Sequence, residues 1–219
     1  MTDRDVVSLK TGCRDGWGVR VVFERKADRY AHEIQCFLGH NTTSLLCSLE
    51  GGADRRWPES PPLQQLSIEE RGDGSRLALL VGMAGQSHWS ASVHAEIERP
   101  RVEFDIACLA RESPTWLGSS YRLERASRAA DPSHASLVVP LQTAAVEQAT
   151  TPRVPDASSP AVLHGRLPVY ASLVTEDLVG ESSSQLTVSQ GLACVTCSVE
   201  SSSFPNTFRW KYALELEVD

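Results

Sequence analysis

Apolar and polar residues alternate along most of this chain, which is the pattern of β-strands that bury one face. The clearest case is the segment 207–218, where every second residue is apolar: Phe208, Trp210, Tyr212, Leu214, Leu216 and Val218. Similar alternation occurs in 17–23, 30–38, 45–49, 87–97 and 102–108, and in shorter form in 66–68, 120–123, 167–173, 186–188 and 193–199. The pattern predicts an all-β fold, a large antiparallel sandwich or barrel of about ten to twelve strands with little helix.

One short segment is apolar on both faces. Leu77 to Val81 carry no polar residue, and the turn formers of 71–75 precede them. The turn formers indicate a hairpin, and the continuous apolar run predicts a central strand that is covered on both sides.

The composition changes between about 126 and 161, where Ala, Ser, Thr and Pro predominate. We interpret this stretch as a polar loop or cover segment. The roughly 58 residues that follow it are too few for an independently stable domain, because small domains bury too little surface. We therefore expect a single all-β domain over 1–219, completed by the C-terminal strands.

The overall charge narrows the classes of partner. The chain has 21 basic and 28 acidic residues, a formal net charge of -7, so it lacks the basic surface that neutralises phosphates, and we expect no nucleic-acid partner. No apolar run approaches the roughly 18 residues of a membrane span. The charged start, residues 1–5, does not resemble a signal peptide. These features predict a cytoplasmic protein without a membrane partner, whose six cysteines stay reduced.

A cluster of polar side chains follows from the register of one hairpin. If residues 98–101 form a four-residue loop, Ile97 faces Val102 and every apolar residue of the two strands meets another. The same register places His94 opposite Asp105, with Cβ atoms about 4.5–5.5 Å apart, and Glu96 opposite Glu103. His94, Glu96, Glu103 and Asp105 are therefore candidate catalytic or metal-binding residues. The alternative is a solvated polar face, which antiparallel sheets commonly have.

The cysteines give weaker signals. A six-residue loop over 39–44 would place Cys36 opposite Cys47, either as a redox-sensitive pair or as two buried thiols. Cys194 and Cys197 have the spacing of a metal or redox motif, but they lie within a strand pattern, where their sulfur atoms should point to opposite faces. We interpret this second spacing as coincidental.

Two segments that interrupt the strand pattern carry aromatic residues, namely 57–62 and 82–90. Loops at the mouth of a sandwich or barrel often form binding sites. The candidate binding residues are Trp57, Gln64, Gln65, Ser87, His88, Trp89 and Trp116. The alternative is that the tryptophans fill the ends of the core.

No catalytic or phosphate-binding motif is present, and we predict no cofactor. The leading hypothesis is a non-catalytic protein that binds a small molecule or a protein partner through the aromatic loops. One alternative is an enzyme, a hydrolase or isomerase of a sugar-like substrate that uses the His94 cluster, with or without a metal. The other is a structural or assembly protein without a pocket. An open sheet edge would also support a homo-oligomer.

Overall fold

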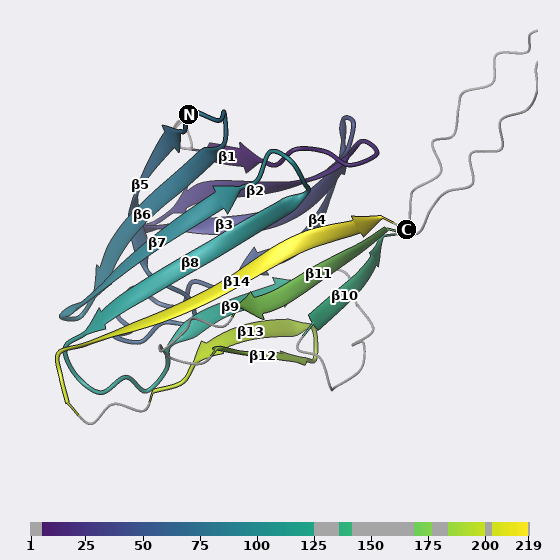
Figure 1. The fold of residues 1–219 in the computed structure, drawn as a ribbon. Coiled ribbons are helices and arrows are strands. Elements are labelled where there is room, and N and C mark those ends of the chain that lie inside the picture. Colours follow the sequence, from purple (N-terminus) through teal and green to yellow (C-terminus); the bar gives the residue numbers. More distant parts are fainter. Residues whose placement is uncertain (1–5, 125–135, 142–168, 177–183, 200–202, 219) are drawn as a thin grey trace, which may run out of the picture.

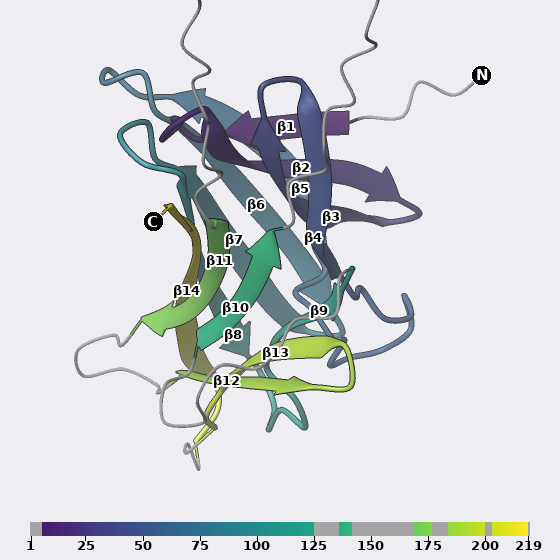
Figure 2. The same ribbon diagram turned by 90° about the vertical axis from the view of Figure 1, so that its right-hand side faces the viewer.

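A computed structural model describes residues 6–124, 136–141, 169–176, 184–199 and 203–218. These residues form strands, turns and loops and contain no helix, so none of them belongs to a helix that could cross a membrane. Figures 1 and 2 show the strands in two layers, each an antiparallel sheet. The all-β prediction is confirmed, and the arrangement is sandwich-like.

The first sheet has the order β1-β2-β3-β4-β9-β13-β12. Its strands are β1 (Val6–Lys10), β2 (Trp17–Lys26), β3 (Arg29–Leu38), β4 (Asn41–Ser48), β9 (Gly118–Leu123), β12 (Ser184–Ser189) and β13 (Leu192–Cys197). Its two outer strands pair with nothing beyond them among the described residues, so this sheet is open.

The second sheet has the order β10-β11-β14-β8-β7-β6-β5. Its strands are β5 (Leu63–Glu70), β6 (Arg76–Ala84), β7 (Ser87–Ala95), β8 (Arg101–Ala110), β10 (Ser136–Leu141), β11 (Val169–Glu176) and β14 (Asn206–Val218). No described strand joins its ends to those of the first sheet, so the described strands form two open sheets rather than a barrel.

The described residues contain fourteen strands, more than the ten to twelve that the sequence predicted. The two additional strands are β1, a short segment without regular alternation, and β10. Strand β10 lies inside the segment that was expected to be a loop and pairs with β11. The remainder of that segment, 126–135 and 142–161, lies outside the described residues.

The core lies between the facing surfaces of the two sheets. The alternating positions fill it as expected, and its largest fully buried side chains include Phe23, Phe104, Tyr121, Trp210 and Tyr212. Strand β6 departs from the prediction, because the side chains of Val81 and Met83 are 46% and 45% exposed. They lie on the outer face of the second sheet, so β6 is covered on one face only.

Candidate functional site

The hairpin of β7 and β8 has a different register from the predicted one. Ala95 pairs with Val102 and His94 with Glu103, a shift of two residues, so the expected pairing of His94 with Asp105 is wrong. Residues 97–100 form the turn, and the backbone N–H of Leu216 in β14 donates to the carbonyl of Pro100 at 3.0 Å. Ile97 therefore lies in the turn rather than in the strand, and it is 46% exposed.

The carboxylates of the predicted cluster are all paired with cations on the outer face of the second sheet. The pairs are Asp105 with Arg209, Glu103 with Lys211, and Glu96 with Arg99 and Arg101. Arg209 donates from Nε to Asp105 Oδ1 at 2.7 Å. Lys211 Nζ lies 2.9 Å from Glu103 Oε2. We call these residues the charged ladder.

The charged ladder does not form a metal centre. Within the described part of the chain, no group of three or more His, Cys, Asp and Glu side chains is arranged to hold a metal ion. The imidazole of His94 borders the ladder, and its buried Nε2 atom makes no hydrogen bond to the described residues. The carboxylates therefore serve as ion-pair partners.

The predicted contact between Cys36 and Cys47 is also wrong. A two-residue turn at Gly39 and His40 pairs Leu38 with Asn41, in place of the expected six-residue loop. Cys36 then pairs with Thr43, and a bulge after Ile34 places Cys47 opposite Glu33. The Cys36 thiol is buried, whereas Cys47 is half-buried. The two cysteines of the 194–197 spacing do lie on opposite faces of β13, with Cys197 buried and Cys194 half-buried.

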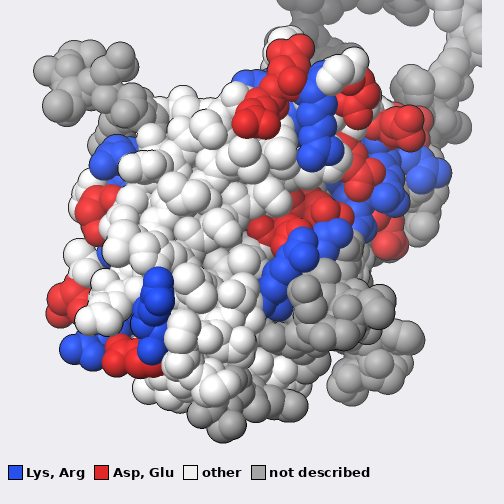
Figure 3. Space-filling view, turned by 60° about the vertical axis from the view of Figure 1, so that its left-hand side comes forward, with Lys and Arg blue, Asp and Glu red and all other residues white. Residues whose placement is uncertain are grey.

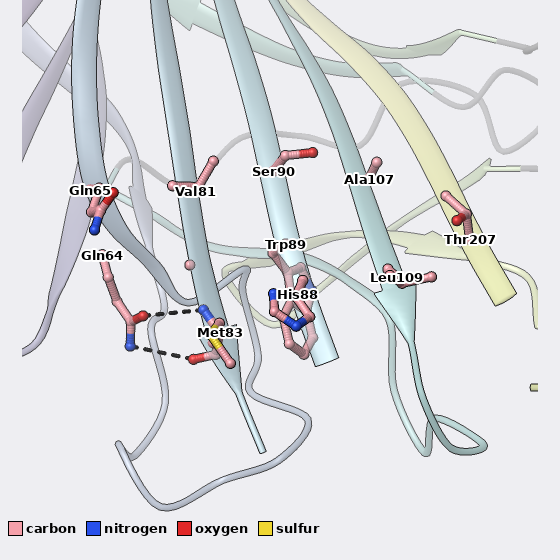
Figure 4. Close-up of a pocket in the computed structure, with 11 residues that line it drawn as sticks. Gln64, Gln65, Val81, Met83, His88, Trp89, Ser90, Ala107, Leu109 and Thr207 are labelled. Carbon is pink, nitrogen blue, oxygen red and sulfur yellow. Dashed lines mark hydrogen bonds between the residues drawn. The ribbon is translucent and has the colours of Figure 1, made fainter. Parts of the chain in front are cut away.

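A pocket of about 450 Å³ lies on the outer face of the second sheet. Figure 4 shows that β5, β6, β7, β8 and β14 contribute its lining. Its residues are Gln64, Gln65, Val81, Gly82, Met83, His88, Trp89, Ser90, Ala107, Leu109 and Thr207. The volume falls within the range of small-molecule sites.

The strand register explains the shape of this pocket. Ser90 pairs with Ala107, and these two small side chains form its floor. On the β6 side of the floor stand the exposed side chains of Val81 and Met83. Along the next cross-strand row, His88 pairs with Leu109, which lies opposite Thr207 of β14. Small residues between larger ones thus leave a depression on the sheet.

The lining contains no Asp, Glu, Lys or Arg side chain. The charged ladder begins directly beside it, since Arg209 pairs with Ala107 in the register of β14 and β8. Figure 3 shows a broad uncharged area with acidic and basic side chains along its borders. The pocket therefore suits a neutral ligand better than an ion.

One of the lining residues has a structural role. Gln64 is the extra residue of a bulge in β5, between the pairs of Leu63 with Gly82 and Gln65 with Val81. Its side-chain amide accepts a hydrogen bond from the Met83 backbone N–H at 3.2 Å and donates one to the Met83 carbonyl at 3.3 Å (Figure 4). This pair of bonds fixes the rim of the pocket.

Of the seven candidate binding residues, the structure brings Gln64, Gln65, His88 and Trp89 together in the pocket lining. The other three, Trp57, Ser87 and Trp116, lie outside the lining. The Trp57 ring packs edge-on against the Trp89 ring, with centroids 5.7 Å apart. Ser87 is buried and accepts a hydrogen bond from the Arg111 N–H, and Trp116 donates from Nε1 to the carbonyl of Glu59.

Sequence reasoning missed the sheet residues of the pocket, which are Val81, Gly82, Met83, Ser90, Ala107, Leu109 and Thr207. The segment 82–90 was expected to interrupt the strand pattern, although alternation was recognised from residue 87. Ala84 pairs with Ser87 across a two-residue turn, so most of the segment belongs to β6 and β7. The sequence feature closest to the pocket was the apolar run from Leu77 to Val81, which was interpreted as a strand covered on both faces. In the structure Val81 and Met83 are exposed, so this part of β6 presents an apolar outer face.

No protein-family model matches the chain, and no curated protein matches it significantly.

Proposed function

We propose that this protein is a non-catalytic binding protein that holds a small, neutral, largely apolar molecule in the pocket on the outer face of the second sheet. The observation that carries the proposal is a depression of about 450 Å³ whose lining has no charged residue. Val81, Met83 and Leu109 supply apolar contact, while Gln65, His88 and Thr207 supply hydrogen-bonding groups around it. A planar ring would fit over the small side chains of Ser90 and Ala107.

The binding proposal accounts for the site better than the enzyme alternative does. A hydrolase or isomerase that used the His94 cluster would need a carboxylate free to exchange a proton. Each carboxylate of the cluster instead neutralises a guanidinium or ammonium group. Within the pocket, His88 is the one histidine of the lining, and it has no acidic neighbour there.

Three ligands of equal size and different charge test the proposal: benzyl alcohol, benzoate and benzylammonium. Binding is followed by the amide chemical shifts of the ¹⁵N-labelled protein. We expect benzyl alcohol to shift the resonances of Ser90, Ala107 and Leu109 at millimolar concentration, and the two ions to bind several-fold more weakly, because the lining cannot neutralise them.

The variant Ala107→Phe fills the floor of the pocket and should abolish these shifts. Ser67→Phe is the matched control, because Ser67 is exposed on β5 and lies outside the pocket lining. Retained binding by Ala107→Phe, or equal binding of all three probes, would argue against a neutral ligand at this site.

A further inference from the structure

The hairpin of β12 and β13 carries no charged residue. Residues 184–197 contain no Asp, Glu, Lys or Arg, although these residue types make up 22% of the chain. Strand β12 is the outermost strand of the first sheet, and no described strand pairs with its far side (Figures 1 and 2). An uncharged edge is unusual, because the unpaired backbone groups of an edge invite another strand to add to it.

The other three outer strands are protected against such an addition. On β1, Arg76 donates from Nη1 to the carbonyl of Ser8 at 3.4 Å. On β5, which has a bulge and ends in two glutamates, Arg25 donates from Nη1 to the carbonyl of Gln64 at 3.1 Å. Strand β10 contains Pro140, which has no N–H to donate. Among the outer strands of the described residues, β12 alone has no charge, proline, bulge or guanidinium at its edge.

The register of the hairpin determines which backbone groups of β12 point away from the sheet. Cys197 of β13 donates its N–H to the carbonyl of Leu117, on the side of β9. Adjacent residues of a strand direct their backbone groups to opposite sides, so Thr196 bonds towards β12, where it pairs with Gln185. Gln185 and the other odd-numbered residues of β12 therefore bond to β13. The N–H and C=O groups of the even-numbered residues point out of the sheet.

Two of these outward-bonding residues, Leu186 and Val188, are apolar. Their side chains lie on the inner face of the sheet, beside Val195 and Ala193 of β13. They are only half-buried, whereas Val195 and Ala193 are fully buried. A further strand at this edge would complete the burial of Leu186 and Val188 and also supply partners for their backbone groups.

We propose that β12 pairs antiparallel with β12 of a second copy of this chain, so that the first sheets of two molecules form one continuous sheet. A two-fold axis at Thr187 places each Leu186 opposite Val188 of the other copy. These two residues then exchange N–H···O=C bonds with each other, and their apolar side chains meet on the inner face. Thr187 lies opposite Thr187 of the other copy, so no like charges are opposed.

The charge of the chain favours a second copy at this edge over any other. With a net charge of -7, two copies repel each other through most surfaces, and the uncharged hairpin is a place where they can meet without that cost. A partner selected by charge would find no complementary group there. The contact is short, because the six residues of β12 span about 20 Å. An interface smaller than the standard size should give a dissociation constant of about 10–100 µM.

Sedimentation equilibrium of the full chain between about 5 and 500 µM tests the dimer. Thr187 is exposed, and each of the variants Thr187→Lys and Thr187→Glu places two like charges opposite each other at the two-fold axis. Each variant alone should raise the dissociation constant about five-fold. An equimolar mixture of the two should associate at least as tightly as wild type, because lysine then faces glutamate. A wild-type protein that stays monomeric throughout, or a mixture that does not recover association, would overturn the proposal.

The control variant is Ser67→Lys, which places a charge on the exposed face of β5, the edge strand of the other sheet. It should leave the dissociation constant unchanged, and a five-fold increase would place the contact at β5 instead.

Amide hydrogen exchange of the wild type tests the register. The Leu186 and Val188 amides should exchange about four-fold more slowly at 500 µM than at 5 µM, as expected for a dissociation constant near 50 µM. The Thr187 amide is bonded within the hairpin at both concentrations and should not change. An equal response of the three amides would overturn the proposed pairing.

Discussion

The side-chain amide of Gln64 binds both backbone groups of Met83, as the backbone of a neighbouring strand would. Strand β5 is displaced there by a bulge, so its regular pairing with β6 ends at Gly82. The amide extends that pairing by one residue and places the exposed Met83 side chain beside the floor of the pocket.

Gln64→Ala should therefore destabilise the protein by about 1 kcal/mol, because two solvent-exposed hydrogen bonds are lost. Urea denaturation monitored by tryptophan fluorescence measures the change. The matched control is Gln65→Ala, an exposed neighbour that also lines the pocket and should cost at most about 0.5 kcal/mol. Equal costs for the two variants would mean that the Met83 contacts contribute nothing to stability.

The sequence was sufficient to predict the strands that show regular alternation, such as β7, β8 and β14. It could not predict how those strands pair, because register depends on the turns and bulges between them. A two-residue shift at Ile97 preserves every inward apolar position and yet exchanges the partner of His94. The two-residue turn at Gly39 and His40 separates Cys36 from Cys47 in the same way, because it shifts the register of β3 and β4 by four residues.

The pocket was only partly predictable for a related reason. His88 and Trp89 were candidates because they form a polar and aromatic pair, and Gln64 and Gln65 were candidates because they lie close to the proline-rich loop. Nothing in the sequence marks Ser90 and Ala107 as residues of a binding site. They form a floor only because the register places two small residues side by side between larger ones.

The stability that the charged ladder contributes should depend on the salt concentration. Asp105→Asn removes the charge that Arg209 binds through two nitrogen atoms. The Arg209 side chain is 43% exposed, so solvent screening limits the expected loss of stability to about 1 kcal/mol or less. The loss should shrink when the same denaturation is repeated in about 1 M salt, where the Debye length is near 3 Å.

The control for this experiment is Glu69→Gln, which removes an exposed acidic residue from the same sheet. A cost of Asp105→Asn that did not depend on salt would show that packing, rather than charge, accounts for its effect.

The cysteines should differ widely in reactivity. Burial raises the pKa of the Cys108 thiol to about 12, so almost none of it is the reactive thiolate at neutral pH. Cys13 is exposed. Iodoacetamide at pH 7.5 should label Cys13 in the native protein and leave Cys108 unmodified, as mapped by mass spectrometry of peptides. In guanidinium chloride both should react, and native labelling of Cys108 at the rate of Cys13 would contradict the structure.

Glu50 should make the protein less stable as the pH rises. Burial raises the pKa of its carboxyl group from 4.5 to about 7 in the folded state, although the Ser48 hydroxyl and Arg29 act in the opposite direction. Between these two values the folded protein binds more protons than the unfolded chain, so stability falls with increasing pH. His32 has the opposite sign, since the stability that depends on its neutral form is lost as the pH falls from 6.5 towards 4.

The difference in unfolding free energy between Glu50→Gln and wild type isolates this effect from that of His32. Because Glu50 keeps partial contact with solvent, we expect the variant to gain about 1–2 kcal/mol on wild type between pH 5 and pH 8. The exposed Glu69→Gln variant should show no such gain. If the Glu50→Gln difference were constant across this range, the carboxyl group would be ionised throughout and its burial would not govern the pH dependence of folding.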